Sequence, residues 1–340
     1  MAISTVAIMG TGAWGTTFAQ VLADTGVQVK LWGRSEETVA HIRQGANPKY
    51  LPGVQLSNRI SATTDLKQAL QDADLLVVAV PTQTIRTVLN QWKRQILEAN
   101  VPVLTLSKGI EDGTGLLVTQ VVADVLGLPE RQVAALSGPN LAREIIAMHP
   151  TATVIAATDL ELARSIVAAC HNDYFRPYVT ADVVGAEVAG ASKNVIALAV
   201  GAAEGMGWGI NTRATLITRG LAEMTRLGIA MGAQADTFAG LAGMGDLVAT
   251  CSSHLSRNYS FGLRIGQGLS LGEATKRSAG VVEGARTAGP LVDFARSIGV
   301  SMPISEAVRA VVETGVDVNE MGQRLLQRPA KMDGWRLQNL

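Results

Sequence analysis

The sequence predicts an α/β protein in which a parallel sheet is followed by an all-helical part. Three observations carry this prediction: short apolar runs alternate with helical patterns in the first half, a glycine-rich turn follows the first run, and long Ala- and Gly-rich segments at helical spacing begin beyond Asp182. Strands buried in a parallel sheet read as continuous apolar runs. Because 340 residues exceed one ordinary core, we expect two domains, residues 1–182 and 183–340.

Composition and charge restrict the class of partner. The chain is 47% hydrophobic and 17% charged, with zero net charge. It is therefore globular and shows no electrostatic footprint for nucleic acid or an anionic membrane. Cys170 and Cys251 have no metal-binding spacing and are typical of a reduced, cytoplasmic protein. The longest charge-free helical run, residues 194–203, is about half a membrane span, and we expect neither a signal peptide nor stable membrane anchoring.

The strongest motif is the glycine-rich turn, residues 10–15, which follows the first apolar run at 4–9 and precedes a helical pattern that ends at Gly26. In the order strand, G-x-G-x-x-G, helix, Gly10 permits the tight turn, Gly12 lets the backbone approach a pyrophosphate, and Gly15 lets the helix pack closely on the strand. The pyrophosphate would accept hydrogen bonds from free N–H groups at the helix start. The alternative is a turn that binds nothing.

The end of the second predicted strand, residues 28–32, indicates which cofactor is used. An NAD-specific site usually places an acid there, but this chain has none before Glu36 and carries Arg34 instead. Arg34 could pair with a 2′-phosphate, stack on adenine, or be a solvated loop charge. We favour NADPH, or use of both cofactors, over strict NAD.

Further apolar runs place two polar segments near the glycine-rich turn. After a helix at 36–43 and a loop at 47–53, buried strands are expected at 75–80, 101–106, 133–136 and 153–156. Ligands bind beyond the C-terminal ends of parallel strands. Lys108 and the turn at 138–140 follow two of these strands, so we expect both to face the same crevice as the glycine-rich turn.

The helical part contains three further candidates. Lys193 lies in a long apolar helix predicted over 183–203, where a lysine is costly unless it is paired or used; a structural ion pair or a snorkelling lysine is the alternative. Asp246 follows a glycine-rich stretch and could cap a helix or serve the site, with Thr250 on its face. The stretch 256–258 offers phosphate donors at a helix start, or simply an N-cap with a solvated arginine.

Together these motifs resemble the soluble NAD(P)-dependent glycerol-3-phosphate dehydrogenase family. The matching stretches, in the family's order, are Gly10–Gly15, Trp32–Arg34, Tyr50–Gly53, Ser107–Gly109, Ser137–Glu144, Ala191–Gly201, Gly240–Leu247, Ser256–Gly262 and Val281–Gly284. One departure is Asn140, where bacterial members more often carry serine; asparagine still offers a donor and an acceptor.

The resemblance implies a Rossmann-type domain followed by an all-helical domain, with the active site between them. It implies reversible reduction of dihydroxyacetone phosphate to sn-glycerol 3-phosphate by NADPH or NADH without a metal, feeding glycerolipid synthesis. Lys193 would be the catalytic lysine. The implied substrate-binding residues are Lys108, Gly138, Asn140, Asp246, Thr250, Ser256, Arg257 and Asn258. The implied cofactor-binding residues are Gly10, Thr11, Gly12, Ala13, Trp14, Gly15, Arg34, Tyr50, Lys108, Ala142, Arg257, Val281 and Glu283.

The expected partner is a small phosphorylated molecule, and the chain could form a homodimer. Two other functions remain open from the sequence. One alternative is a hydroxyacid dehydrogenase with the same architecture, which would have no use for a phosphate pocket at 256–258. The other is a nucleotide sensor without catalysis, which would have no reason to carry Lys108, Lys193 and Asp246.

Overall fold

The first half of the molecule is built on one eight-stranded sheet. The computed structural model describes residues 2–278 and 280–327, and its strand order is β10-β9-β8-β7-β6-β1-β2-β5. The strands are β1 (Thr5–Met9), β2 (Gln28–Trp32), β5 (Ile60–Thr63), β6 (Leu75–Val78), β7 (Val103–Thr105), β8 (Val133–Ser137), β9 (Thr151–Ala157) and β10 (Phe175–Thr180). From β8 to β5 all neighbours pair in parallel, as the apolar runs predict.

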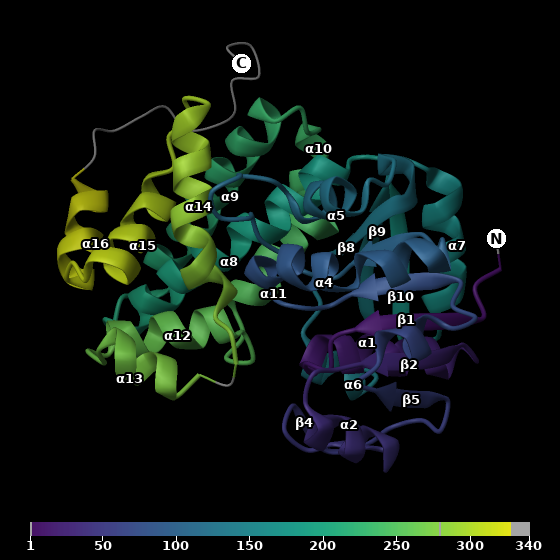
Figure 1. Ribbon diagram of the computed structural model, residues 1–340. Helices are drawn as coiled ribbons and strands as arrows, with labels where there is room; N and C mark the ends of the chain where they lie inside the picture. Colours follow the sequence, from purple (N-terminus) through teal and green to yellow (C-terminus); the bar gives the residue numbers. More distant parts are fainter. Residues whose placement is uncertain (1, 279, 328–340) are drawn as a thin grey trace.

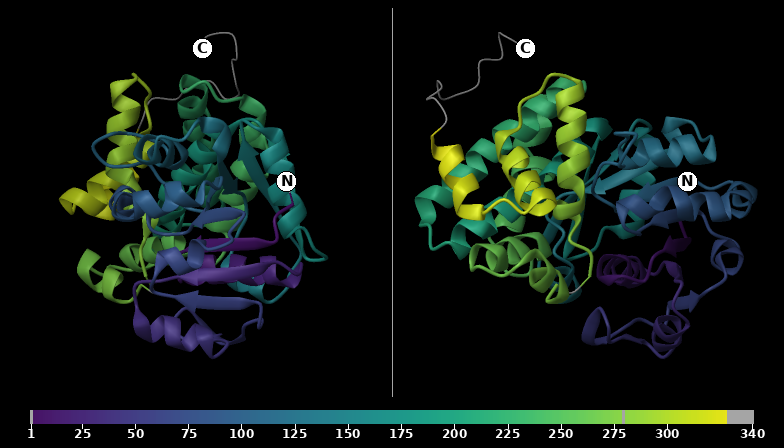
Figure 2. Two further views of the ribbon diagram at one scale, coloured as in Figure 1. Left: turned by 45° about the vertical axis from the view of Figure 1, so that its right-hand side comes forward. Right: turned by 60° about the vertical axis from the view of Figure 1, so that its left-hand side comes forward.

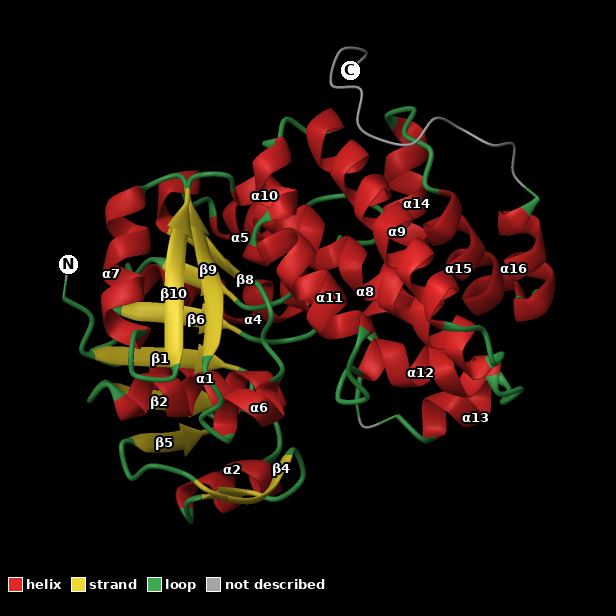
Figure 3. Ribbon diagram, turned by 180° about the vertical axis from the view of Figure 1, so that it is seen from behind, coloured by secondary structure: helices red, strands yellow, loops and turns green. Residues whose placement is uncertain are grey.

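The last two strands depart from the expected parallel sheet. β9 runs antiparallel to β8, and β10 pairs with β9 in parallel, so both oppose the remaining strands (Figure 3). The helix between β8 and β9, α6 (Ala142–Ile146), has only 5 residues. At about 1.5 Å per residue such a helix is too short to return along a strand that rises about 3.3 Å per residue. The chain therefore re-enters the sheet from the end at which it left.

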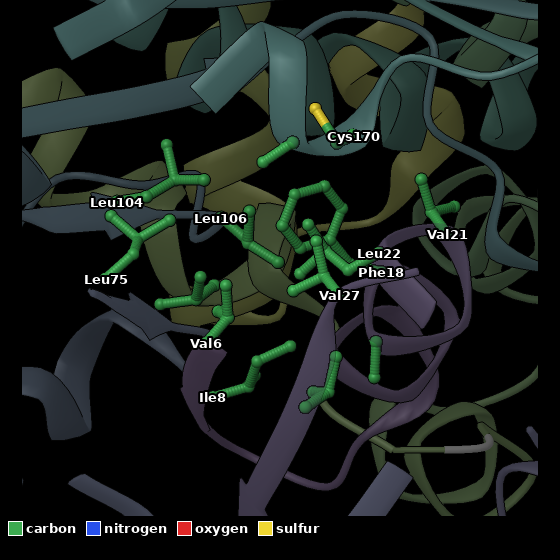
Figure 4. Packing of buried hydrophobic residues seen from close by; sticks show 14 of the residues in the cluster. Val6, Ile8, Phe18, Val21, Leu22, Val27, Leu75, Leu104, Leu106 and Cys170 are labelled. Carbon is green, nitrogen blue, oxygen red and sulfur yellow. The ribbon is translucent and has the colours of Figure 1, made fainter. Parts of the chain in front are cut away.

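Helices cover both faces of this sheet (Figure 1). They are α1 (Ala13–Asp24), α2 (Glu36–Arg43), α3 (Leu66–Leu70), α4 (Ile85–Ala99), α5 (Val118–Leu126), α6 and α7 (Leu160–Cys170). Alternate residues of a strand point to opposite faces. Val6 and Ile8 pack with Phe18 of α1 and with residues of α2, α6 and α7. Figure 4 shows part of this cluster. Ala7 and Met9 pack with α3, α4 and α5 instead.

A small hairpin stands where the sequence predicts a loop at 47–53. Its strands are β3 (Ala46–Asn47) and β4 (Leu51–Gln55), and Tyr50 lies in the turn between them. Two short 3₁₀ turns, η1 (Thr82–Thr84) and η2 (Glu130–Gln132), complete the first half. Strands of two residues carry too little periodicity to be recognised in a sequence.

The second half is helical and stands beside the sheet (Figure 2), and its elements surround one long central helix, α8 (Val183–Gly205). Around it lie α9 (Ile210–Ala230), α10 (Ala235–Ala239), the π-helical turn η3 (Leu241–Gly245), α11 (Asp246–Cys251), α12 (Arg257–Gly266), α13 (Leu271–Lys276), α14 (Glu283–Ser297), α15 (Pro303–Thr314) and α16 (Val318–Leu326). By length and composition α8 could cross a membrane, but 83% of its apolar window is buried inside the molecule. It is the core helix of this half, as its apolar sequence predicts.

Glycines bring α8 and α12 into direct backbone contact. A Cβ on Gly201 would lie 2.0 Å from the carbonyl oxygen of Tyr259, and one on Gly262 would lie 2.0 Å from that of Leu198. No larger residue fits at either position without moving a helix. This close crossing holds the start of α12 against α8 on the C-terminal side of Lys193.

Candidate active site

A buried carboxylate joins two lysines that come from different halves of the molecule. Asp246 opens α11 and is 1% exposed. Its Oδ2 lies 2.6 Å from Nζ of Lys108, which follows β7, and its Oδ1 lies 3.0 Å from Nζ of Lys193 in α8. Asp246 lies in the first turn of α11, as the sequence allows, but its side chain does not cap the helix, because its carboxylate oxygens pair with the two ammonium groups. Lys193 is buried rather than snorkelling to the surface, and it is paired with Asp246.

Two further groups complete this network. Lys193 Nζ donates to Thr250 Oγ1 at 2.7 Å, and the Thr250 hydroxyl donates to Asp246 Oδ1 at 3.1 Å. Lys108 Nζ donates to the carbonyl oxygen of Gly138 at 2.9 Å. The turn after β8 and the face shared by Asp246 and Thr250 therefore meet at the lysine pair.

Burial and charge act in opposite directions on these groups. Burial lowers the pKa of Lys108 to about 8, the Asp246 carboxylate opposes this shift, and the Lys193 ammonium adds to it. Burial alone would raise the pKa of Asp246, but the two ammonium groups outweigh it and hold that pKa below its ordinary value. Asp246 is thus a fixed negative charge at neutral pH, whereas the pKa of Lys108 lies at about 8.

Glycines in the second half let these side chains meet. A Cβ on Gly243, within the π-helical turn, would lie 2.2 Å from the carbonyl oxygen of Phe238, so only glycine lets the chain fold back tightly before Asp246. A Cβ on Gly190 would lie 3.2 Å from Cγ of Lys108 and 3.1 Å from Oγ of Ser137. Gly190 therefore lets α8 approach closely enough for the two lysines to share one carboxylate.

The stretch 256–258 sits at the start of α12 beside α8. The Ser256 side chain accepts a hydrogen bond from the Tyr259 N–H, which confirms the N-cap interpretation for this residue. Asn258 Nδ2 donates to Asn194 Oδ1 at 2.8 Å, and Asn258 Oδ1 accepts from the Gly284 N–H at 2.8 Å. Asn258 thereby joins α8, α12 and α14.

Arg257 lies at the same helix start with its side chain exposed. It lies near Gly280, where a Cβ would be 3.0 Å from one of its guanidinium nitrogens. Its charge attracts the carboxylate of Glu283, whose pKa burial nevertheless raises. The Thr82 backbone also hydrogen bonds to Glu283, so this residue links α14 to the first half. Arg257 and Glu283 thus lie together at the junction between the halves, and Val281 lies between Gly280 and Glu283 in the chain.

The glycine-rich turn has the geometry that its sequence predicts. Gly10 has a φ of +133°, and a Cβ there would lie 2.4 Å from the carbonyl oxygen of Ala79. A Cβ on Gly15 would lie 2.3 Å from the carbonyl oxygen of Gly10, whereas nothing lies within 4 Å of one on Gly12. The first and third glycines are thus required by close packing, and the second faces open space at the start of α1.

The remaining candidates surround this turn. Arg34 is exposed just beyond β2 and follows Gly33, where a Cβ would lie 2.6 Å from Cγ2 of Thr11. Trp14 stacks at a tilt on Phe18, and its indole Nε1 is buried without a partner among the described residues. Ala142 accepts a hydrogen bond from Thr17 of α1 at 3.4 Å. The structure therefore brings the first-half candidates to one edge of the sheet.

Sequence reasoning missed two residues that support the site. Thr153, on the reversed strand β9, donates to the carbonyl oxygen of Ser137 at 2.8 Å and accepts from Asn140 Nδ2 at 3.1 Å, which fixes the turn that offers the Gly138 carbonyl. Asn194 was visible as a polar residue beside Lys193 in an apolar helix, but only its bond to Asn258 reveals its use. Neither contact could be inferred from spacing along the chain.

The mostly parallel sheet carries an open glycine-rich turn, and the helical half beside it carries a buried lysine. This combination is typical of nicotinamide-dependent dehydrogenases. Residues 5–163 match the model of the NAD-dependent glycerol-3-phosphate dehydrogenase N-terminus, and residues 182–323 match that of its C-terminus. The chain therefore belongs to the NAD-dependent glycerol-3-phosphate dehydrogenase family.

Individual relatives agree over nearly the whole chain. A glycerol-3-phosphate dehydrogenase (NAD(P)+) of Streptomyces griseus is 49% identical over 326 residues, covering 96% of this chain and 97% of the relative. That of Corynebacterium urealyticum is 50% identical over 328 residues, covering 96% and 98%. The crystal structure of glycerol-3-phosphate dehydrogenase from Coxiella burnetii has a TM-score of 0.91 at 35% identity and covers 96% of this chain and 99% of that one.

Proposed function

We propose that this chain catalyses the reversible transfer of hydride between NAD(P)H and dihydroxyacetone phosphate, which yields sn-glycerol 3-phosphate for glycerolipid synthesis. Residues 1–182 would form the cofactor domain and 183–340 the catalytic domain, with Asp182 capping the first turn of α8 at the proposed boundary. The single observation that carries this proposal is the pair of lysines on one carboxylate at the junction, within a chain of this family.

The lysine pair suits the reduction of a ketone. A bound NADPH or NADH supplies the hydride. Charge then develops on the ketone oxygen, and an ammonium within hydrogen-bond reach can stabilise it and donate the proton. Two ammonium groups against one carboxylate leave one net positive charge at the junction, which also favours an anionic phosphorylated substrate. We assign proton donation to Lys193, and substrate orientation to Lys108 and Thr250.

The experiment that tests this function is a cofactor-oxidation assay on the pure protein. Dihydroxyacetone phosphate should be reduced with either NADPH or NADH, and a 3-hydroxy acid should not be oxidised in the reverse direction. Turnover of the hydroxy acid alone would favour the second dehydrogenase class. Cofactor binding without turnover of either substrate would favour a sensor.

Arg34 is expected to bias the enzyme toward NADPH. It is an exposed guanidinium at the end of β2, and Trp32, Gly33 and Ser35 around it carry no charge. Arg34→Ala should weaken the binding of NADPH more than that of NADH, by about 1–3 kcal/mol if one charged hydrogen bond is lost. Michaelis constants for both cofactors measure this, with the exposed Arg94→Ala on α4 as the control. Equal changes for the two cofactors would remove Arg34 from cofactor choice.

Arg257 is expected to hold the substrate phosphate. Its exposed side chain stands at the N-terminus of α12, next to the amide of Asn258. Arg257→Ala should greatly reduce kcat/KM for dihydroxyacetone phosphate while sparing much of the slow activity toward dihydroxyacetone, because a bidentate guanidinium–phosphate contact is absent with the second substrate. The exposed Arg277→Ala on the neighbouring segment is the control. Equal losses on both substrates would assign Arg257 to cofactor or structure.

The wider setting follows from the same function. The partner is a small phosphorylated substrate, and we propose a cytoplasmic enzyme that binds neither nucleic acid nor membrane stably and that can form a homodimer. The zero net charge supports the absence of stable nucleic-acid binding, and the burial of α8 supports the absence of stable membrane anchoring.

A further inference from the structure

Asn47, at the end of β3, makes two hydrogen bonds to the glycine-rich turn and its helix. It is 1% exposed. Its Nδ2 donates to the carbonyl oxygen of Thr11 at 3.0 Å and to Oγ1 of Thr16 at 2.9 Å. Among the described residues its Oδ1 has no partner. The donor end of this amide is therefore the part that the structure uses, and Thr16 adds a weaker bond of 3.3 Å to the same Thr11 carbonyl.

The Thr11 carbonyl controls the direction of a neighbouring N–H group. It belongs to the same peptide unit as the N–H of Gly12, and the described residues contain no cis peptide bond. In a planar trans peptide the carbonyl and the N–H point in opposite directions. Holding the carbonyl toward Asn47 therefore turns the Gly12 N–H away from it. Gly12 is the N-cap of α1, where N–H groups have no partner within the helix.

Asn47 also holds the turn that carries Tyr50. Its own carbonyl oxygen accepts a hydrogen bond from the Tyr50 N–H at 3.1 Å. Thr11 also lies so close to Gly33 that a Cβ on Gly33 would be 2.6 Å from the Thr11 methyl group. One buried residue thus joins two segments that are distant in sequence, and Thr11 is fixed between that residue and the end of β2.

We infer that Asn47 is a positioning residue for the adenosine diphosphate part of the dinucleotide. It keeps the Gly12 N–H aimed at the pyrophosphate and keeps the turn with Tyr50 beside it. This inference rests on the proposed function, because it assigns the cofactor to the glycine-rich turn. The NH₂ group suits this place because it carries two N–H donors, one for the Thr11 carbonyl and one for the Thr16 hydroxyl oxygen.

The first test is Asn47→Ala, measured by cofactor fluorescence and steady-state kinetics. The dissociation constants of NADPH and NADH should rise by the same factor, about tenfold, because the pyrophosphate is common to both. With saturating cofactor, kcat and the KM for dihydroxyacetone phosphate should stay within about twofold of wild type. A residue that only supported the fold would lower kcat as well. Asn58→Ala, at an exposed position between β4 and β5, is the control and should change neither the dissociation constants nor the kinetic constants.

Asn47→Asp sharpens the test because it keeps the size of the side chain. The carboxylate cannot donate to the Thr11 carbonyl and places negative charge near the pyrophosphate. Asn47→Asp should therefore weaken the binding of both cofactors more than Asn47→Ala does. Should neither Asn47 variant fold, Thr16→Val is compared with Thr16→Ser, which keeps the hydroxyl. The valine variant should bind both cofactors about threefold more weakly than the serine variant.

The outcomes separate this inference from the proposed function. Normal wild-type binding, together with Asn47→Ala binding within about twofold of wild type, would overturn the inference and leave the function intact. Equal cofactor affinities for Thr16→Val and Thr16→Ser would do the same. A wild-type protein that bound neither NADPH nor NADH would overturn the proposed function and the inference together.

Discussion

Replacing Lys193 with methionine is expected to lower the rate of hydride transfer strongly while leaving the fold and cofactor binding in place. Methionine keeps the length and apolar body of lysine within a buried helix, and Asp246 keeps Lys108 as its partner, so the fold should survive. The rate of hydride transfer should fall by at least the roughly 10²–10⁴-fold associated with a positioned acid. The loss should be larger if the ammonium also stabilises the developing alkoxide.

The geometry around Lys193 explains this size of effect. Its Nζ is held by Asp246 Oδ1 at 3.0 Å and by Thr250 Oγ1 at 2.7 Å, which fixes the ammonium at the junction of the two halves. A preorganised donor costs no reorganisation when charge develops. Lys193→Arg should not restore activity, because a guanidinium does not release its proton near neutral pH and has a different shape.

Two measurements decide the role of Lys193: single-turnover hydride transfer at saturating substrate, and cofactor affinity by fluorescence. Lys276→Met, at an exposed position of α13, is the matched control and should leave both unchanged. A Lys193→Met protein that binds cofactor normally and transfers hydride within a few-fold of wild type would exclude Lys193 as the proton donor. Lys108, which holds the other oxygen of Asp246, would then take its place.

The sequence predicts the parts of this site that local chemistry marks. Three glycines in a strand–turn–helix context identify the first, and a lysine within an apolar helix identifies the second. The position of Lys108 follows from a general rule, because the C-terminal ends of parallel strands share one edge of a sheet. Each of these signals lies within a few residues of chain.

Contacts between distant segments could not be predicted in the same way. Asp246 and Lys108 are 138 positions apart, and only the folded chain distinguishes an ion-pair acid from a helix cap. The reversal of β9 depends on the short helix α6, whose five residues carry no clear periodicity. Thr153 and Asn47 act through backbone carbonyls, which every residue type possesses, so no pattern of side chains announces their partners.

Replacing Asp246 with asparagine is expected to disable the enzyme and to destabilise it in a pH-dependent way. The amide has one oxygen for two ammonium groups, and its NH₂ group must face one of them. Breaking a buried ion pair by removing one partner costs about 3–5 kcal/mol in the free energy of unfolding. The rate of ketone reduction should fall by about 10²-fold or more, because the lysine that donates the proton loses its anchor.

The pH dependence follows from Lys108. Burial lowers its pKa to about 8 in the folded protein, against 10.5 for an ordinary lysine. Between these values the unfolded state binds more protons, so the free energy of unfolding rises with pH through that window. Without the Asp246 carboxylate the pKa of Lys108 falls further, and the window opens at lower pH. The deficit of Asp246→Asn relative to wild type should therefore narrow between about pH 6 and about pH 8, and stay level above that.

Urea unfolding at the two pH values, together with kcat/KM for dihydroxyacetone phosphate, measures both parts of this expectation. Asp236→Asn, at an exposed position of α10, is the matched control and should change neither quantity. A deficit that stayed constant with pH would mean that Lys108 keeps its proton without Asp246. Near-normal kcat/KM in Asp246→Asn would mean that the two lysines reach their working positions without the shared carboxylate, and the network would then serve folding alone.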